Sequence, residues 1–291
     1  MLQNKKSLGQ NWLKDRFTLE EIAESARSEV DFCVEIGPGL GTLTSSLLKR
    51  FPKVVAIEFD EKLAHNLPNS FPGKNLEVIN TDVLDFDFSQ LDGDFSVAGN
   101  IPYYITSPII RKLLLLEKKP AKIVLLMQKE VADRILEEKG RYSFLTLFVQ
   151  NYADVEGGIF VERKLFTPPP KVDSASVIFY PREKSLVSEE VLKFVKQCFA
   201  NPRKKLQGML PHFTGRNREE IVKIFEELGF DLRRGAKKTF THDFGDGWVA
   251  KITMTVGAKK DFEEIMKHSE GFMGYEWIID SILKHGKIVK K

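Results

Sequence analysis

The sequence is poor in cysteine and histidine, and it contains no long apolar run. Its 291 residues include 2 cysteines, Cys33 and Cys198, and 5 histidines. Cysteines this far apart form no metal-ligand pair, so we expect free thiols in a reducing compartment, the cytoplasm. There is no stretch of about 18 apolar residues, which excludes an apolar membrane-spanning helix. The segment that begins at Met1 has no apolar signal region either, so we expect no export.

The net charge is small, but the basic and acidic residues are unevenly distributed along the chain. Residues 181–238 carry 14 Lys and Arg against 8 Asp and Glu, and residues 239–291 carry 8 of each. With a total of +3, the first 180 residues sum to −3. A basic block in a near-neutral protein is typical of a surface that binds a polyanion, although a solvated helix face would have the same composition.

Short apolar segments alternate with helical patterns through the first 180 residues. Strands are predicted at 30–37, 53–58, 76–80, 95–98 and 123–128, helices at 42–50 and 129–138, and a last pair of strands at 158–161 and 174–180. Strands that alternate with helices predict a mostly parallel sheet covered by helices, which is the Rossmann-like α/β fold class.

The pattern changes near residues 181–186. Amphipathic helices are predicted at 189–199 and 218–228, then a hairpin of 239–244 and 248–256 around a glycine turn, and two more helices at 259–268 and 275–285. We therefore predict an α/β domain at 1–183, a small helical domain at 184–238, and an appended α+β segment at 239–291 whose role is unassigned.

Residues suited to a nucleoside cofactor follow three successive strands. Gly37 and Gly39 let the backbone turn tightly and approach a ligand closely. Glu58 ends the next strand, where an acidic residue can accept hydrogen bonds from both ribose hydroxyls. Asp82 follows the third strand, and its side chain could accept from an adenine amino group or serve only in a turn. Together they predict a cofactor site, although a dehydrogenase has similar features.

The fourth strand leads into Asn100-Ile-Pro102-Tyr103, which favours methyl transfer to a planar amine over oxidation and reduction. The lone pair of adenine N6 is delocalised into the ring. Hydrogen bonds from its two N–H groups, to the Asn100 side-chain oxygen and to a carbonyl near Pro102, would favour a pyramidal nitrogen. Tyr103 offers an aromatic face for an extruded base. The segment predicts an S-adenosylmethionine-dependent methyltransferase, unless it is only a turn with a core tyrosine.

Five ordered motifs make the resemblance to a family specific. Residues 5–15 (KKSLGQNWLKD) resemble the KSxGQNFLxD opening of KsgA-type small-subunit rRNA adenine dimethyltransferases. So do residues 35–42 (EIGPGLGT), 99–108 (GNIPYYITSP), 127–134 (MQKEVADR) and 166–175 (FTPPPKVDSA). The resemblance covers residues ~4–235. It implies a class I methyltransferase domain, a small helical RNA-binding domain, and two methyl groups added to each of two adjacent adenines near the 3′ end of small-subunit rRNA.

The same resemblance assigns the cofactor contacts. It implies that Asn11 and Leu13 lie over S-adenosylmethionine and that Gly37 lies under its methionine part. Glu58 would hold the ribose and Asp82 the adenine, while Asn100 would line the methyl-transfer site.

For the RNA, the resemblance implies that Phe166 stacks on the target base opposite Tyr103. An alternative is that Phe166 is a core aromatic that anchors the proline-rich loop. Arg203, Lys204 and Lys205 match a basic helix of the family, which would bind phosphates and position the RNA.

The chain departs from the family after residue 235, where about 50 residues match nothing in its pattern. His242, Asp243 and Asp246 in the predicted hairpin invite a metal site. Because Asp-Gly turns are common, we expect no metal.

Two other functions stay open. A large-subunit rRNA methyltransferase of the macrolide-resistance type shares the cofactor and Asn-x-Pro-Tyr motifs, but residues 127–134 and 166–175 favour the small-subunit type. A non-enzymatic ribosome-assembly factor would bind the pre-ribosomal small subunit. We expect a monomer that binds rRNA and no membrane.

Overall fold

The structure is a computed structural model that describes residues 10–136, 143–200, 211, 215–227, 238–243 and 249–254. The chain divides into two compact units, of which the first comprises residues 1–136 and 152–184 and the second residues 137–151 and 185–291. The predicted division into three parts stays a prediction. None of the helices in the described ranges is long and apolar enough to cross a membrane.

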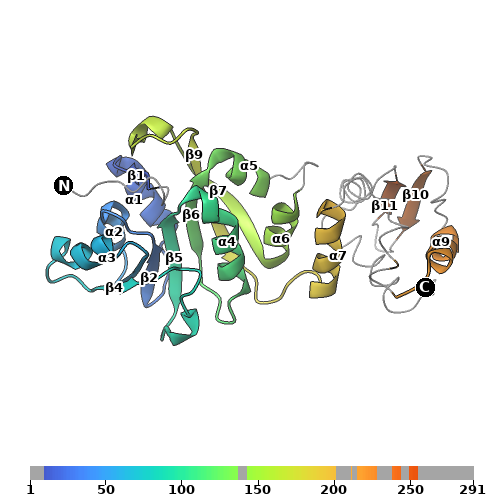
Figure 1. Cartoon of the computed structure of the whole chain (residues 1–291), viewed down its shortest axis with the longest axis horizontal. Helices are drawn as coiled ribbons and strands as arrows, with labels where there is room; N and C mark the ends of the chain where they lie inside the picture. The colour runs from blue at the N-terminus through green and yellow to red at the C-terminus, as the bar shows by residue number, and fades with distance from the viewer. Residues whose placement is uncertain are drawn as a thin grey trace. The chain divides into compact units, whose positions relative to one another are not determined.

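A seven-stranded sheet forms the centre of the first unit, in the order β4-β3-β2-β5-β6-β9-β7 (Figure 1). Its strands are β2 (Phe32–Ile36), β3 (Val54–Glu58), β4 (Leu76–Asn80), β5 (Phe95–Asn100), β6 (Ile123–Gln128), β7 (Ala153–Val161) and β9 (Ser174–Pro181). The first five are parallel, and β9 runs antiparallel between β6 and β7. Every residue of β2 and β3 is buried, as expected of parallel strands covered on both faces. The predicted α/β fold is confirmed.

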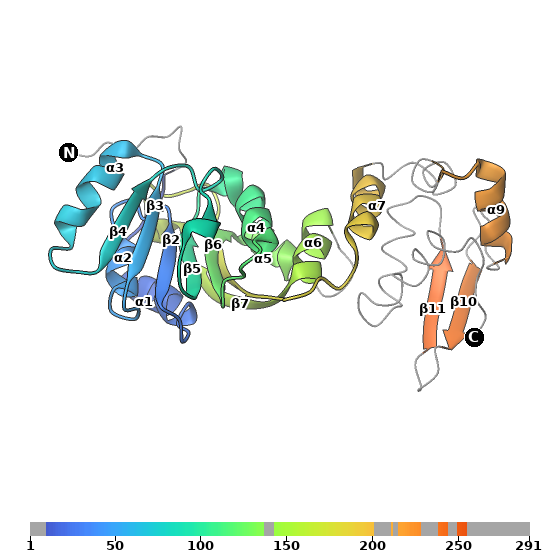
Figure 2. The same ribbon diagram turned by 90° about the horizontal axis from the view of Figure 1, so that it is seen from below.

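Helices cover both faces of this sheet (Figures 1 and 2). They are α1 (Arg16–Ser25), α2 (Thr42–Leu47), α3 (Glu61–Asn66), α4 (Thr106–Leu115) and α5 (Lys129–Ile135). Apolar residues of α1 and α2 form one core cluster with Cys33, Ala98 and Val124 of the sheet. The α1 helix begins at an N-cap, Asp15, whose side chain accepts from the Thr18 N–H at 2.8 Å. That cap fixes where the chain enters the helix shortly after β1 (Trp12–Leu13).

The structure also describes three further helices and a hairpin. The helices are α6 (Phe144–Tyr152), α7 (Glu189–Ala200) and α9 (Arg218–Glu227). As the glycine turn predicted, β10 (Lys238–Asp243) and β11 (Val249–Met254) pair antiparallel. The helices predicted at 259–268 and 275–285 lie outside the described residues.

One pairing was not predicted from the sequence. The two-residue strands β1 (Trp12–Leu13) and β8 (Phe166–Thr167) pair antiparallel, with Leu13 opposite Phe166. A further hydrogen bond of 3.2 Å joins the Lys14 N–H to the Leu165 carbonyl. This pairing ties the start of the described chain to the segment before β9.

Gly41, directly before α2, has a left-handed backbone in a crowded place. Its φ is +80°, and an added Cβ would lie 2.7 Å from Phe71 Cε2 and 2.8 Å from Leu67 Cδ1. Glycine is therefore required there both by the dihedral angle and by the space.

Two alanine substitutions distinguish the cost of the dihedral angle from the cost of the crowding. Gly73 also has a positive φ, +73°, but nothing lies within 4 Å of an added Cβ. Gly73→Ala should lower the free energy of unfolding by about 1–2 kcal/mol, the cost of a left-handed non-glycine residue. Gly41→Ala should lower it by a further ~1–3 kcal/mol because the Phe71 and Leu67 side chains must move. Urea denaturation measures both, and equal losses would show that the crowding is relieved without cost.

Candidate active site

The carboxyl edge of the parallel strands gathers side chains from three of them on one face. Glu35 of β2 lies opposite Ala56 of β3 and Ala98 of β5. Since side chains alternate along a strand, Glu58 and Asn100, two residues further on, project to the same face as Glu35. Residues from separate strands therefore meet at one place, as in other open α/β sheets.

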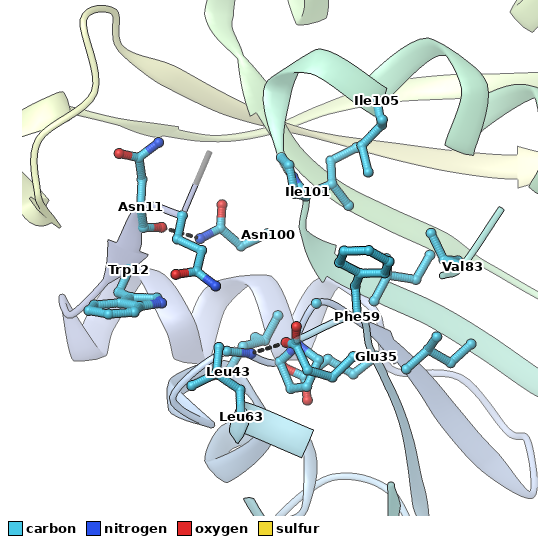
Figure 3. A pocket seen from close by; sticks show the side chains of 18 of the residues that line it. Asn11, Trp12, Glu35, Leu43, Phe59, Leu63, Val83, Asn100, Ile101 and Ile105 are labelled. Atoms are coloured by element: carbon cyan, nitrogen blue, oxygen red, sulfur yellow. Dashed lines mark hydrogen bonds between the residues drawn. The ribbon is translucent and has the colours of Figure 1, made fainter. Parts of the chain in front are cut away.

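A cavity of about 180 Å³ lies at this edge (Figure 3). Eight residues selected from the sequence line it: Asn11, Leu13, Gly37, Gly39, Glu58, Asp82, Asn100 and Tyr103. Phe166 does not line it, and Arg203, Lys204 and Lys205 lie outside the described residues. The structure thus brings together the predicted cofactor residues and part of the predicted catalytic set.

Glu58 is held in place by backbone groups on both sides. Its side chain is only 6% exposed. One carboxylate oxygen accepts from the Gly39 N–H at 3.0 Å, and the other accepts from the Asp60 N–H at 2.8 Å. Burial raises the pKa of this carboxyl, while the hydrogen bonds from Asp60 and Gly39 act against the rise. Each oxygen keeps a lone pair, so the carboxylate can still accept from two hydroxyls.

Asp82 and Gly39 form other parts of the wall. One carboxylate oxygen of Asp82 accepts from the Leu84 N–H at 2.8 Å, which leaves the other oxygen for a ligand. Gly39 has φ +57°, and a Cβ on it would lie 3.3 Å from the Trp12 indole ring. The indole therefore packs closely against the glycine loop.

Asn100 has a fixed orientation. Its Nδ2 donates to the Asn11 carbonyl at 3.0 Å, and the side-chain oxygen points away from that contact (Figure 3). With the amide nitrogen engaged, the oxygen is the atom that can accept from a substrate. The nearby Pro102 carbonyl accepts from the Ile105 N–H at 3.2 Å and keeps one lone pair.

Tyr103 lines the cavity as a half-buried ring. Its hydroxyl lies 2.7 Å from the Ser174 hydroxyl, which holds the ring in place from β9. Burial raises the pKa of Tyr103, so the phenol stays neutral. Its hydroxyl is engaged with Ser174, which leaves the face of the ring as the part that can contact a flat substrate.

Phe166 belongs to the core and not to the cavity. Only 2% of the residue is exposed, and it packs in the same apolar cluster as Leu13 and Leu19. A ring buried in this way cannot stack on a base in this conformation. This packing agrees with the alternative considered from the sequence, a core aromatic that anchors the proline-rich loop, and base stacking by Phe166 stays a prediction.

Glu35 is a cavity-lining acid that sequence reasoning missed. It is 1% exposed, and its Oε2 atom has no hydrogen-bond partner. Burial raises its pKa to about 8; Thr44 at the start of α2 opposes this rise, and the Glu58 carboxylate adds to it. The only signal in the sequence was an acid inside an otherwise apolar strand.

The polar groups of this cavity fit S-adenosylmethionine. Glu35, Glu58 and Asp82 line it, whereas none of the lining residues in the described ranges is a lysine, arginine or histidine. Carboxyl groups suit the positive sulfonium and ammonium groups. The buried Trp12 Nε1 has no hydrogen-bond partner and is a donor available for the carboxylate end of such a ligand.

Within the described ranges, no three His, Cys, Asp or Glu side chains are grouped so that they could hold a metal ion. Of the hairpin residues considered for a metal, His242 and Asp243 lie in β10, and Asp246 is outside those ranges. A parallel sheet with a glycine loop and strand-end acids at its carboxyl edge, followed by Asn-x-Pro-Tyr, defines an S-adenosylmethionine-dependent methyltransferase of the Rossmann-like class.

Comparison with known proteins identifies the family. The profile of the ribosomal RNA adenine dimethylases matches residues 1–229. Ribosomal RNA small subunit methyltransferase A of Bacillus thuringiensis is 39% identical over 259 residues, 82% of this chain and 88% of that protein. The protein of the same name from Prosthecochloris aestuarii is 42% identical over 213 residues, 71% of this chain and 81% of that protein.

Solved structures lead to the same class of protein. A dimethyladenosine transferase from Plasmodium falciparum matches with a TM-score of 0.64 and 31% identity, covering 76% of this chain and 90% of that one. The 23S rRNA methyltransferase ErmE matches with a TM-score of 0.59 and 26% identity, covering 89% and 100%. The chain belongs to the ribosomal RNA adenine dimethylase family. It is an rRNA adenine dimethyltransferase that uses S-adenosylmethionine.

The raised pKa of Glu35 predicts how stability depends on pH. Because the folded-state pKa of about 8 exceeds the ordinary 4.5, the folded protein keeps a proton that the unfolded chain has lost between these values. The free energy of unfolding should therefore fall as the pH rises from about 5 to 8, by up to ~1.4 kcal/mol per pH unit. Glu35→Gln should remove this contribution and make the protein more stable at pH 8.

Chemical denaturation at several pH values measures the effect. Glu77→Gln is the matched control, because Glu77 is exposed on β4 and pairs with Lys53. If Glu35→Gln shows the same pH slope as the wild type, Glu35 ionises normally in the folded protein.

Proposed function

We propose that this chain dimethylates the N6 amines of adjacent adenines near the 3′ end of small-subunit rRNA, with the cavity described above as the active site. The observation that carries the proposal is the orientation of Asn100, whose amide nitrogen is bound to Asn11 while its oxygen stays available in the cavity. Its position at the end of β5, beside the glycine loop, suits an amine that must approach a methyl donor.

The cofactor contacts follow from the strand ends. Glu58 accepts hydrogen bonds from the ribose hydroxyls, and Asp82 accepts from the adenine amino group. Gly37 and the segment of Asn11 and Leu13 would hold the methionine part. When bound, S-adenosylmethionine supplies an electrophilic methyl group.

The protein activates the amine by its geometry. The Asn100 oxygen and the Pro102 carbonyl accept from the two N–H groups of N6, which holds the nitrogen pyramidal with its lone pair toward the methyl group. The Tyr103 ring contacts the extruded base. No strong base is required before attack, because the amine becomes acidic once it is alkylated.

The choice of small-subunit rRNA rests on the relatives. Two proteins that are 39% and 42% identical are named small subunit methyltransferases. ErmE, whose title names 23S rRNA, is 26% identical. The test is incubation of the wild-type protein with each ribosomal subunit, followed by primer extension across both rRNAs. Stops at two adjacent adenines in the small-subunit rRNA are expected, and stops confined to the large-subunit rRNA would overturn the assignment.

Arg203, Lys204 and Lys205 are proposed to bind rRNA phosphates. Support comes from the net positive charge of residues 181–238 and from the family pattern. We also propose a monomer in the cytoplasm that acts on the pre-ribosomal small subunit. A role in subunit assembly is compatible with this activity, because both need the same bound rRNA.

Asn100→Ala should lower kcat by ~10²-fold or more, because an oriented acceptor is lost from the transition state. RNA affinity should change little. Asn80→Ala is the matched control: Asn80 also ends a strand, and its Nδ2 donates to the Glu58 and Phe59 carbonyls, but it does not line the cavity. Single-turnover methyl transfer and RNA binding measure the two effects. Retained methyl transfer with lost RNA affinity would make Asn100 a binding residue only.

A further inference from the structure

The cavity contains two buried carboxyl groups of different character. Glu35 and Glu58 project to the same face of neighbouring parallel strands, and both line the cavity. Glu58 accepts backbone hydrogen bonds on both oxygens, whereas Oε2 of Glu35 accepts none. The neighbouring charge of Glu58 disfavours ionisation of Glu35, whose Oε2 has no donor. Burial and this neighbour therefore favour the protonated form of Glu35 in the free protein.

None of the cavity-lining residues in the described part of the chain supplies a positive charge to Glu35. On its own strand the neighbouring titratable group is Cys33, whose pKa is raised by burial, so its thiol stays neutral. Ala56 flanks Glu35 on β3 and Ala98 flanks it on β5. From α2 it faces Thr44, and the other carboxyl groups of the cavity are those of Glu58 and Asp82. The charge that would stabilise ionised Glu35 must therefore come from a ligand.

The two ligands of a methyltransferase, the methyl donor and the product, differ in the charge at sulfur. S-adenosylmethionine has a positively charged sulfonium, and S-adenosylhomocysteine, the product, has a neutral thioether. They otherwise share the adenine, the ribose and the amino-acid end. Groups that contact the shared parts, such as Glu58 and Asp82, cannot tell them apart by charge. A buried carboxyl close to the variable charge can, and Glu35 lines the cavity two residues before Gly37, toward which the methionine part is proposed to extend.

We propose that Glu35 is a specificity-determining residue: its carboxyl loses a proton to solvent when the sulfonium cofactor binds, and regains one when the thioether product occupies the cavity. The inference rests on the proposed cofactor site. Its consequence is that the preference for cofactor over product increases as the pH rises from about 6 to 8, because less free energy is then needed to remove the proton. Product inhibition is weakened by the same residue.

The size of the effect follows from linkage. An opposite charge within a few ångström lowers the pKa of a carboxyl by about 1–3 units. Each unit changes the ratio of the two dissociation constants about 10-fold when the pH exceeds the pKa of the free protein. We expect a difference of at least ~0.3 proton released between the two ligands at pH 7, and a preference for the cofactor that falls about 5-fold or more in Glu35→Gln at pH 8.

Calorimetric titration of the full-length protein in two buffers of different ionisation enthalpy measures this proton release directly. S-adenosylmethionine and S-adenosylhomocysteine are titrated into the wild type and Glu35→Gln at pH 6, 7 and 8. The amino groups of the ligands titrate in the same range, so each ligand is compared between the two proteins. Glu35→Gln keeps the size of the side chain and lacks the proton.

Asp82→Asn is the matched control. It removes a cavity carboxyl that is proposed to contact only the adenine, which both ligands share. It should weaken both ligands by a similar factor and leave the proton count and the preference for the cofactor unchanged. Glu35→Asp, which keeps a titratable group, should retain part of the proton release.

The outcomes distinguish failure of the proposed cofactor site from failure of the proposed role of Glu35. Failure of both ligands to bind the wild type would overturn the cofactor site itself. If the wild type binds both ligands and releases the same number of protons with each, only the role of Glu35 is overturned. This comparison requires no variant. The role of Glu35 would also be overturned if the wild type and Glu35→Gln released equal numbers of protons. The same holds if Asp82→Asn, too, lost the difference in proton release between the two ligands.

Discussion

A hydrogen bond of 3.0 Å from the Gly39 amide to Glu58 joins the glycine loop after β2 to the end of β3. The other oxygen of the same carboxylate accepts from the Asp60 N–H. Asp60 in turn caps α3 by accepting from the Lys62 and Leu63 amides. One buried carboxylate therefore fixes a loop, a strand end and the start of the next helix. The shape of the cavity depends on it, because each of these segments forms part of the wall.

The same arrangement places negative charge where water is scarce. Three carboxyl groups line the cavity, and two of them, Glu35 and Glu58, are almost fully buried. Burying a carboxylate without a counter-charge is costly, and the protein limits the cost by protonating Glu35. A site of this kind is less stable than an apolar one when it is empty. It is suited to a ligand that brings its own positive charge.

The strand ends could be predicted from the sequence because they depend on local patterns. Apolar runs that stop at Glu58, before Asp82 and at Asn100 mark the carboxyl edge of a parallel sheet, and the structure confirms that these residues share one cavity. The pairing of β1 with β8 could not be predicted. Two-residue strands have no periodicity, and Leu13 and Phe166 come from opposite ends of the first unit.

The pairing of β1 with β8 explains why Phe166 is buried. Its motif suggested a ring over the substrate, but pairing with Leu13 turns it into the core. Glu35 was missed for a related reason. Within the strand it is one polar residue among apolar ones, and its unusual state depends on Glu58 from the next strand and on α2 above it. Contacts between elements determine the burial of Phe166 and the raised pKa of Glu35, and such contacts cannot be predicted from the local sequence.

The charge of the cavity also bears on how RNA is recognised. A phosphate would be repelled by the negative charge of the lining acids, whereas an uncharged base is not. A negative lining of this kind suits a base better than the phosphates of the backbone. The proposed phosphate contacts therefore belong outside the cavity. The basic excess in residues 181–238, set against a net charge of −3 in residues 1–180, agrees with the proposal that the basic segment binds the RNA backbone.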